Sequence, residues 1–199
     1  MVDIKKIYEN LDVIQKLIIL LVFLKNKEPI PGKLWLQKEF FLIAKNIPKL
    51  EDEIDYGPHL KGPFSENVDE ALDDLEKTGI VTIKGKYDGN IELSGIGNKL
   101  ALEVKSEVPR NIEKMMEDIK TFLNDLSERE LLAYIYSSFP KMTEESVLLD
   151  KIKDVRYQLA IRLYSKGKLS LGKASEVADV SQEEFIKELK KKGVRIYEY

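Results

Sequence analysis

Two short helical segments near the end of the chain are separated by only two residues, and this spacing restricts the fold more than any other feature. The pattern predicts helices over Ser170 to Ala178 and Ser181 to Lys192, with Asp179 and Val180 between them. A pair of helices joined this tightly needs a small residue where they cross, and Ser175 is one. The turn needs a residue that tolerates a left-handed backbone, for which Asp179 is acceptable. The segment therefore has the spacing of a helix-turn-helix.

The second of these helices has an apolar face for anchoring and a polar face for contact. Phe185, Ile186 and Leu189 form the apolar face. In a helix-turn-helix, the N-terminal residues of the second helix face base edges while lysines meet phosphates. Glu183 counts against DNA binding because its carboxylate would lie close to the DNA backbone, so a helical hairpin used for packing or protein contact is the alternative. The candidate DNA-contacting residues are Lys168, Lys173, Ser181, Gln182, Lys187, Lys190 and Lys191.

Charge is distributed unevenly along the chain, although the net charge is only −3. The residues up to Asp150 have 20 bases and 28 acids, whereas residues from Lys151 to Tyr199 have 12 bases and 7 acids. A small basic part attached to a larger acidic part indicates two different partners. The alternative is that the lysines of the short C-terminal helices only keep these helices soluble and bind no partner.

The first hundred residues have the element order of a winged helix-turn-helix. Apolar periodicity and turn residues predict three helices, then a hairpin closed by an Asp88-Gly89 turn, then a further helix. Ser65 to Thr78 would take the place of the recognition helix, and Lys84 to Asn90 would be the wing. The helices are predicted over 4–25, 31–46, 65–78 and 95–104, with Pro48 closing the second, and the strands over 80–84 and 91–94.

The helix in the recognition position is too acidic to approach DNA. It contains six carboxylates before its first base, Lys77. Phosphates would repel such a helix, so we expect this module to bind a protein or to dimerise. The candidate partner-binding residues are Asp69, Asp73 and Asp74.

Further helices are predicted over 110–126, 127–139 and 143–164, and a terminal strand over 194–199. Capping boxes mark the helix starts at Ser127 and Ser181, with Glu130 and Glu184 three residues on. The predicted fold class is mainly α, with a winged-helix-like N-terminal module, a small C-terminal helix-turn-helix module and a short β-hairpin wing. The expected parts are the winged-helix-like module (1–107), a helical connector packed on it (108–150) and the basic helix-turn-helix module (151–199).

Composition excludes several kinds of catalytic site. The chain has no cysteine and a single histidine, His59, which excludes thiol nucleophiles, Cys-ligated metal centres and zinc sites built on several histidines. No pair of carboxylates stands out as acid and base, so we expect no catalysis, no cofactor and no metal. The longest apolar run, Leu17 to Leu24, is far shorter than the roughly 20 residues that span a bilayer. Without a signal-peptide pattern as well, the expectation is a soluble cytoplasmic protein with no membrane partner.

The last 45 residues or so resemble a family of small prokaryotic helix-turn-helix proteins regarded as antitoxin-like. The matching pieces are Ala160-Ile161-Arg162-Leu163-Tyr164-Ser165-Lys166-Gly167-Lys168-Leu169-Ser170, Gly172-Lys173-Ala174-Ser175-Glu176, Val180-Ser181, Glu184-Phe185 and Gly193-Val194. The chain departs from the family at Ser175, where Ala is frequent, and at Asp179, where Gly is common. Family members are often linked with genes for PIN-domain nuclease toxins, so the resemblance implies an autoregulating antitoxin.

Residues 10–100 resemble, more weakly, the SocA-like (Panacea) antitoxin domain. The matching pieces are Leu36-Gln37-Lys38-Glu39-Phe40-Phe41-Leu42, Gly62-Pro63-Phe64-Ser65 and the step from Leu75 to Gly79-Ile80. This resemblance implies a protein-binding role. The expected function is a non-catalytic, DNA-binding transcriptional regulator or antitoxin that acts as a homodimer, with 194–199 as one candidate dimer contact. The alternative is a protein-interaction adaptor that does not bind DNA.

Overall fold

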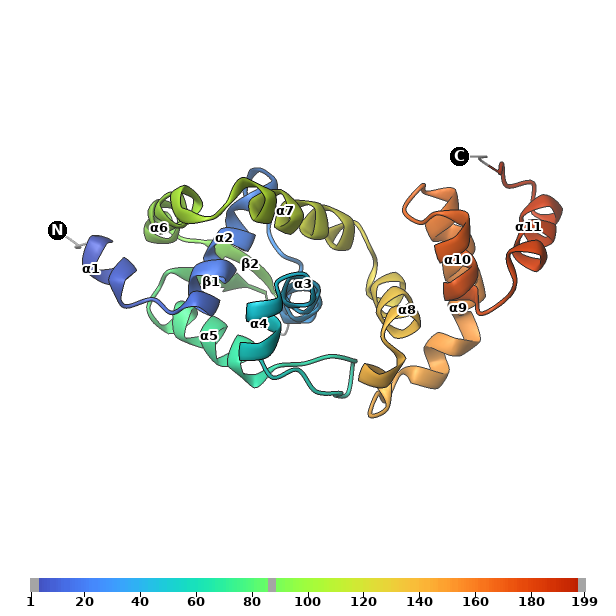
Figure 1. Cartoon of the computed structure of the whole chain (residues 1–199), viewed down its shortest axis with the longest axis horizontal. Helices are drawn as coiled ribbons and strands as arrows, with labels where there is room; N and C mark the ends of the chain where they lie inside the picture. Colours follow the sequence, from blue (N-terminus) through green and yellow to red (C-terminus); the bar gives the residue numbers. More distant parts are fainter. Residues whose placement is uncertain (1–3, 86–88, 197–199) are drawn as a thin grey trace. The chain divides into compact units, whose positions relative to one another are not determined.

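A computed structural model of the chain describes residues 4–85 and 89–196 (Figure 1). It divides into two compact units, which we call the N-terminal unit (residues up to 57 and 63–125) and the C-terminal unit (58–62 and from 126 onward). The boundary after Asp125 falls inside the segment expected to be a connector. Both units are built mainly from helices, and the two strands pair in one small antiparallel sheet, so the expectation of a mainly α fold is confirmed.

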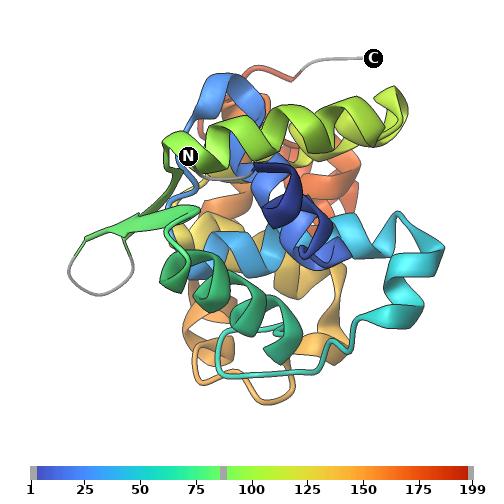
Figure 2. The same cartoon turned by 90° about the vertical axis from the view of Figure 1, so that its left-hand side faces the viewer.

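The N-terminal unit packs its helices around the apolar helix α2. Residues Ile18 to Leu21 of α2 are fully buried, and α5, α6, α7 and β2 surround this helix. Figure 2 shows the β1–β2 hairpin extending from the edge of the unit beside α5. The elements are α1 (Ile4–Glu9), α2 (Val13–Lys27), α3 (Lys33–Lys45), α4 (Pro48–Glu53), α5 (Glu66–Lys77), β1 (Val81–Lys84), β2 (Asn90–Leu93), α6 (Gly95–Glu107) and α7 (Arg110–Asn124).

The prediction of one continuous helix over residues 4–25 is wrong. The chain leaves the helix after Glu9, and Asp12 begins α2 with a capping box. Asp12 Oδ1 accepts from Gln15 N–H at 2.8 Å, and Asp12 N–H donates to Gln15 Oε1 at 3.2 Å. Pro48 also has a different role from the one expected, because α3 ends at Lys45 and Pro48 opens α4. Proline suits a first helical turn because the N–H that it lacks would have no intrahelical acceptor there.

The end of α2 has an uncommon backbone. Lys25, Asn26 and Lys27 have φ angles of 55°, 53° and 62°, in the left-handed region that non-glycine residues rarely adopt. The buried ammonium of Lys120, from α7, donates to three carbonyls at this end of the helix. Its Nζ lies 3.0, 2.9 and 3.0 Å from the carbonyl oxygens of Leu21, Val22 and Leu24. Lys120 therefore satisfies carbonyls that the break in α2 leaves without intrahelical partners.

The hairpin joins β1 to β2 in antiparallel register, with Lys84 opposite Asn90. Ile30, between α2 and α3, forms a bridge with Ile91 of β2 through hydrogen bonds of 3.1 and 2.9 Å. Gly97 in α6 allows a close approach, because a Cβ there would lie 2.3 Å from the carbonyl oxygen of Ile80. Asp88 of the predicted Asp88-Gly89 turn and the centre of the predicted wing, residues 86–88, lie outside the described residues.

The C-terminal unit packs α8, α9 and α10 together, with α11 following α10. The long helix expected from Thr143 starts only at Leu149, because residues 140–143 form a 3-10 turn instead. Residues 194–196 form no strand, and the rest of the predicted strand lies outside the described residues. None of the helices in the described segments is long and apolar enough to span a bilayer. The elements are α8 (Glu128–Ser138), η1 (Pro140–Thr143), α9 (Leu149–Ser165), α10 (Leu171–Ala178) and α11 (Gln182–Lys191).

Candidate nucleic-acid interface

The turn between α10 and α11 has the backbone that the sequence predicts. Asp179 ends α10 with φ 58° and ψ 48°, in the left-handed region. Ser175, only 3% exposed, lies on the inner side of α10, and its hydroxyl donates to the carbonyl of Gly172 at 2.8 Å. The Val180 N–H returns to the carbonyl of Ser175 at 3.2 Å. Short-range hydrogen bonds thus hold the turn that joins the two helices.

The helix α11 is anchored by its apolar residues against α9. Phe185 and Leu189 are fully buried, and the rings of Tyr157 and Tyr164 meet Phe185 edge-on with centroids 6.0 and 6.2 Å away. Ser181 caps the helix by accepting from the Glu184 N–H at 3.2 Å, which is the serine half of the expected capping box. With this face buried, the opposite face of α11 is exposed to solvent.

Five of the seven candidate DNA-contacting residues lie at the start of α11 or along it. Lys187 and Lys190 are exposed and form no ion pair among the described residues, whereas Lys191 lies 3.6 Å from Glu188. The other two candidates belong to the first helix of the pair or precede it. Lys173 on α10 is 2.7 Å from Glu176, and Lys168 is half-buried in the connection from α9.

Arg156 is a residue of this region that sequence reasoning missed. Its guanidinium, on α9, forms an ion pair with the carboxylate of Asp179 at the turn. The pair lies at the wall of a pocket of about 430 Å³ lined by side chains from α8, η1, α9 and α10. Arg156 and Asp179 are 23 residues apart, so helical periodicity contains no signal for their contact. The pair reduces the negative charge beside α11.

The acidic helix α5 of the N-terminal unit is partly neutralised by its neighbour. Lys33 Nζ on α3 lies 3.1 Å from Asp69 and 2.7 Å from Asp73, so two of the three candidate partner-binding carboxylates are paired. The third, Asp74, pairs with Lys77 at 3.1 Å. The exposed carboxylates of α5 that form no ion pair among the described residues are Glu66, Glu70 and Glu76.

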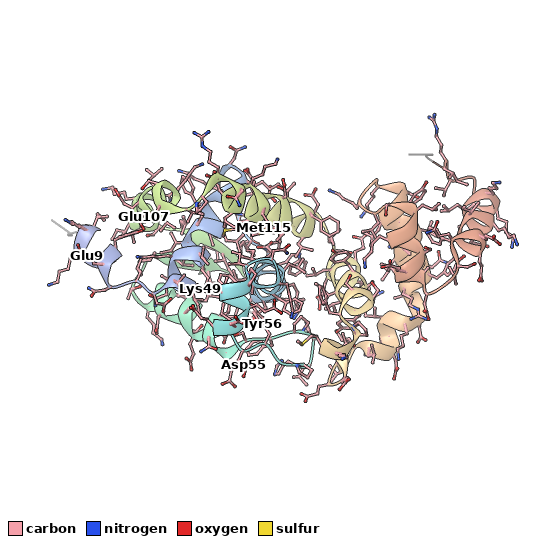
Figure 3. The ribbon with its side chains drawn as sticks, viewed as in Figure 1. Glu9, Lys49, Asp55, Tyr56, Glu107 and Met115 are labelled. Atoms are coloured by element: carbon pink, nitrogen blue, oxygen red, sulfur yellow. The ribbon has the colours of Figure 1, made fainter. Side chains whose placement is uncertain are left out.

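Two sequence pieces behind the N-terminal resemblance are in direct contact. The buried ammonium of Lys38 donates to the carbonyl of Pro63 at 2.7 Å. The side-chain amide of Gln37 forms two hydrogen bonds with the backbone of Ser65. Its Nε2 donates to the Ser65 carbonyl at 3.0 Å, and its Oε1 accepts from the Ser65 N–H at 3.1 Å. Beside them, the ring of Tyr56, labelled in Figure 3, packs edge-on against Phe41 with centroids 5.1 Å apart. These contacts set where α5 begins, because Ser65 is its N-cap.

The described residues thus place two short helices on either side of a left-handed turn, with one face of α11 buried and exposed lysines on the other. Residues 135–199, from the end of α8 through α11, match the model of an uncharacterised protein family (UPF0175). No curated protein matches the chain.

Proposed function

We propose that the chain is a non-catalytic, DNA-binding transcriptional regulator of the antitoxin type, and that its C-terminal unit holds duplex DNA. The observation that carries this proposal is the left-handed turn at Asp179, which joins α10 to a helix anchored on one face and lysine-bearing on the other. In proteins that read DNA with this pair of helices, the second helix lies in the major groove.

The charges around α11 support the proposal. Lys187 and Lys190 are exposed and unpaired within the described segments, so they are available to replace the counterions of phosphates. The nearby carboxylates of Asp179 and Glu176 are neutralised by Arg156 and Lys173. Repulsion of the DNA backbone is therefore smaller than the residue composition alone indicates.

In this proposal the N-terminal unit is a winged-helix-like module that binds a protein. The order α2, α3, α5 and hairpin supports the winged-helix interpretation, as does the bridge from Ile30 to Ile91, which adds a third short segment to the sheet. The exposed acids Glu66, Glu70 and Glu76 favour a partner with a basic surface. A nuclease toxin that handles RNA would present such a surface.

A gel-retardation experiment tests the DNA proposal. The full chain should retard fragments from upstream of its own gene at roughly 50 mM salt, and the affinity should fall steeply as salt rises. Reversing the charge of Lys187, Lys190 and Lys191 to Glu should abolish retardation. The matched control reverses three exposed lysines of the N-terminal unit, Lys49, Lys99 and Lys114, and should bind nearly as the wild type does.

The same experiment tests the rival function, in which the helix pair and the acidic module are both protein contacts of an adaptor. The exposed acids of α5 and the carboxylates within α11 itself favour that rival. An absence of retardation at low salt would refute DNA binding and leave the adaptor as the better proposal. Equal loss in both triple variants would show that net charge, and not the α11 surface, controls binding.

A further inference from the structure

The pocket of about 430 Å³ in the C-terminal unit has an apolar interior. Three of its lining residues, Ala133 on α8, Ile152 on α9 and Val177 on α10, are at most 4% exposed, and we call them the floor of the pocket. Small-molecule sites in proteins have volumes of roughly 300–1,000 Å³ and a mostly apolar lining with a few polar groups. The pocket therefore has the volume and the interior to enclose a small apolar group.

The hydroxyl groups that line the pocket are already bound within the unit. Those of Ser137 and Thr143 each donate to the backbone carbonyl three residues earlier, at 3.0 and 2.7 Å. The hydroxyl of Tyr136 is hydrogen-bonded to that of Ser146. These groups need no polar partner from outside, so the part of a ligand that enters the pocket should be apolar.

Three of the five charged side chains that line the pocket are balanced by ion pairs. Arg156 on α9 pairs with Asp179 at the turn before α11. Glu176 on α10 pairs with Lys173 of the same helix, whose Nζ lies 2.7 Å from its carboxylate. Each of these pairs joins one acid to one base, so together they leave the pocket with no excess charge.

The two remaining charged side chains have opposite signs. They are Lys153 on α9 and Glu144, directly after η1. Both are exposed, and neither forms an ion pair among the described residues. One cation and one anion, supplied by different elements at the edge of an apolar pocket, complement a ligand that carries both charges on an apolar body.

We propose that this pocket is a binding site for a free α-amino acid with a large apolar side chain. Lys153 holds the carboxylate, Glu144 holds the ammonium group, and the apolar side chain enters toward the floor. A free amino acid carries both charges at neutral pH. The lysine ammonium sits on a flexible four-carbon stem, so it can approach the carboxylate while Glu144 approaches the neighbouring amine. The inference does not depend on DNA binding.

Isothermal titration calorimetry of the full chain with leucine and phenylalanine tests the proposal. Both should bind at one site for each chain. Analogues without the amine, isocaproate and hydrocinnamate, should bind about 10-fold more weakly, because one charge-assisted contact is lost. Analogues without the carboxylate, isoamylamine and phenethylamine, should lose affinity to a similar extent. Glycine should also bind more weakly than leucine, because it has no apolar side chain to bury.

Two variants assign the charged contacts. Lys153→Gln should weaken the binding of leucine about 10-fold and leave the binding of the two amines unchanged, since these have no carboxylate. Glu144→Gln should weaken the binding of leucine similarly and leave the binding of the two acids without an amine unchanged. The matched controls are Lys151→Gln and Glu145→Gln, at exposed neighbouring positions that do not line this pocket, and they should bind as the wild type does.

Three outcomes would overturn the proposal. The first is an absence of binding heat with both leucine and phenylalanine. The second is equal affinity for the amino acids and for either series of analogues, which would show that one of the two charges has no partner in the pocket. The third is an equal loss of affinity in the pocket variants and their matched controls, which would show that the effect follows from the charge of the surface and not from Lys153 and Glu144.

Discussion

Glu39 lies on the buried side of α3, and neither of its carboxylate oxygens has a hydrogen-bond partner in the described part of the chain. The charged groups around it are Lys120 on α7 and Lys25 and Glu28 at the end of α2. Burial raises the pKa of Glu39 to about 8, although the charges of Lys120 and Lys25 oppose the rise. Burial likewise lowers the pKa of Lys120 to about 8, against the influence of the Glu39 charge. At neutral pH, Glu39 is therefore protonated and Lys120 is charged.

These two pKa values predict how stability depends on pH. Between the ordinary Glu value of 4.5 and about 8, the folded chain holds a proton on Glu39 that the unfolded chain has lost, so the free energy of unfolding decreases as pH rises. From about 8 to 10.5 the contribution of Lys120 has the opposite sign, because there the unfolded chain holds the extra proton. The contribution of these two groups to the free energy of unfolding is therefore lowest near pH 8.

The variant Glu39→Gln should remove the first contribution. Its thermal midpoint should match the wild type near pH 5 and exceed it at pH 8 by several degrees, which corresponds to a difference on the order of 1–3 kcal/mol in the free energy of unfolding. The reason is that the folded wild type must hold a proton on Glu39 that the unfolded chain has released, whereas the amide needs none. Circular dichroism melts between pH 5 and 9 measure the difference. The control Glu53→Gln, at an exposed position of α4, should run parallel to the wild type. Parallel curves for Glu39→Gln as well would contradict the buried-carboxyl explanation.

At the scale of elements, local signals predicted the helices well and long-range contacts stayed hidden. The helices α10 and α11 begin at Leu171 and Gln182, each one residue after the serine at which the helix was predicted to start. Helix caps and a left-handed turn depend on neighbours in sequence, which is why local patterns indicate them. The break before α2 had a signal too, Asp12 followed by Gln15, but the apolar periodicity continues across it and favoured one helix.

Pairs between distant residues explain what sequence reasoning missed in the candidate sites. Lys33 neutralises Asp69 and Asp73 from another helix, 36 and 40 residues away. No pattern in α5 indicates this, because its own residues show only a run of acids. Counting six carboxylates therefore overstates the negative charge that α5 presents to solvent. The partner-binding residues predicted from that count include Asp69 and Asp73, which Lys33 already pairs.

The acidic helix α5 gives a prediction at this same scale. If a basic partner docks there, replacing Glu66, Glu70 and Glu76 with Gln should slow association about tenfold and leave dissociation nearly unchanged, because unpaired charges steer encounter. Replacing Asp69 and Asp73 with Asn should affect association less, since Lys33 already neutralises them. Surface plasmon resonance with the product of the neighbouring gene, at two salt concentrations, measures both rates. Equal association rates for all three proteins would contradict partner docking on α5.

At the scale of the whole molecule, one helix pair for each chain limits what the chain can recognise on DNA. A single unit of this kind contacts too few base pairs for useful specificity, and two-fold dimers are the usual solution. The terminal segment offered a candidate dimer contact, but residues 194–196 form no strand, so this contact has no support from the described residues. The dimer prediction consequently depends on the geometry of DNA recognition and not on a visible interface.

We expect two chains to bind each operator, with half-sites about 10 base pairs apart from centre to centre, so that both α11 helices reach the major groove on one face of the duplex. Light scattering at tens of micromolar should show a dimer when duplex operator is present. Inserting about 5 base pairs between the half-sites should reduce affinity to that of a single half-site, because half a helical turn moves one half-site to the opposite face, whereas inserting about 10 should restore most of the affinity. A monomer both with and without DNA, or equal affinity at every spacing, would show that one chain acts alone.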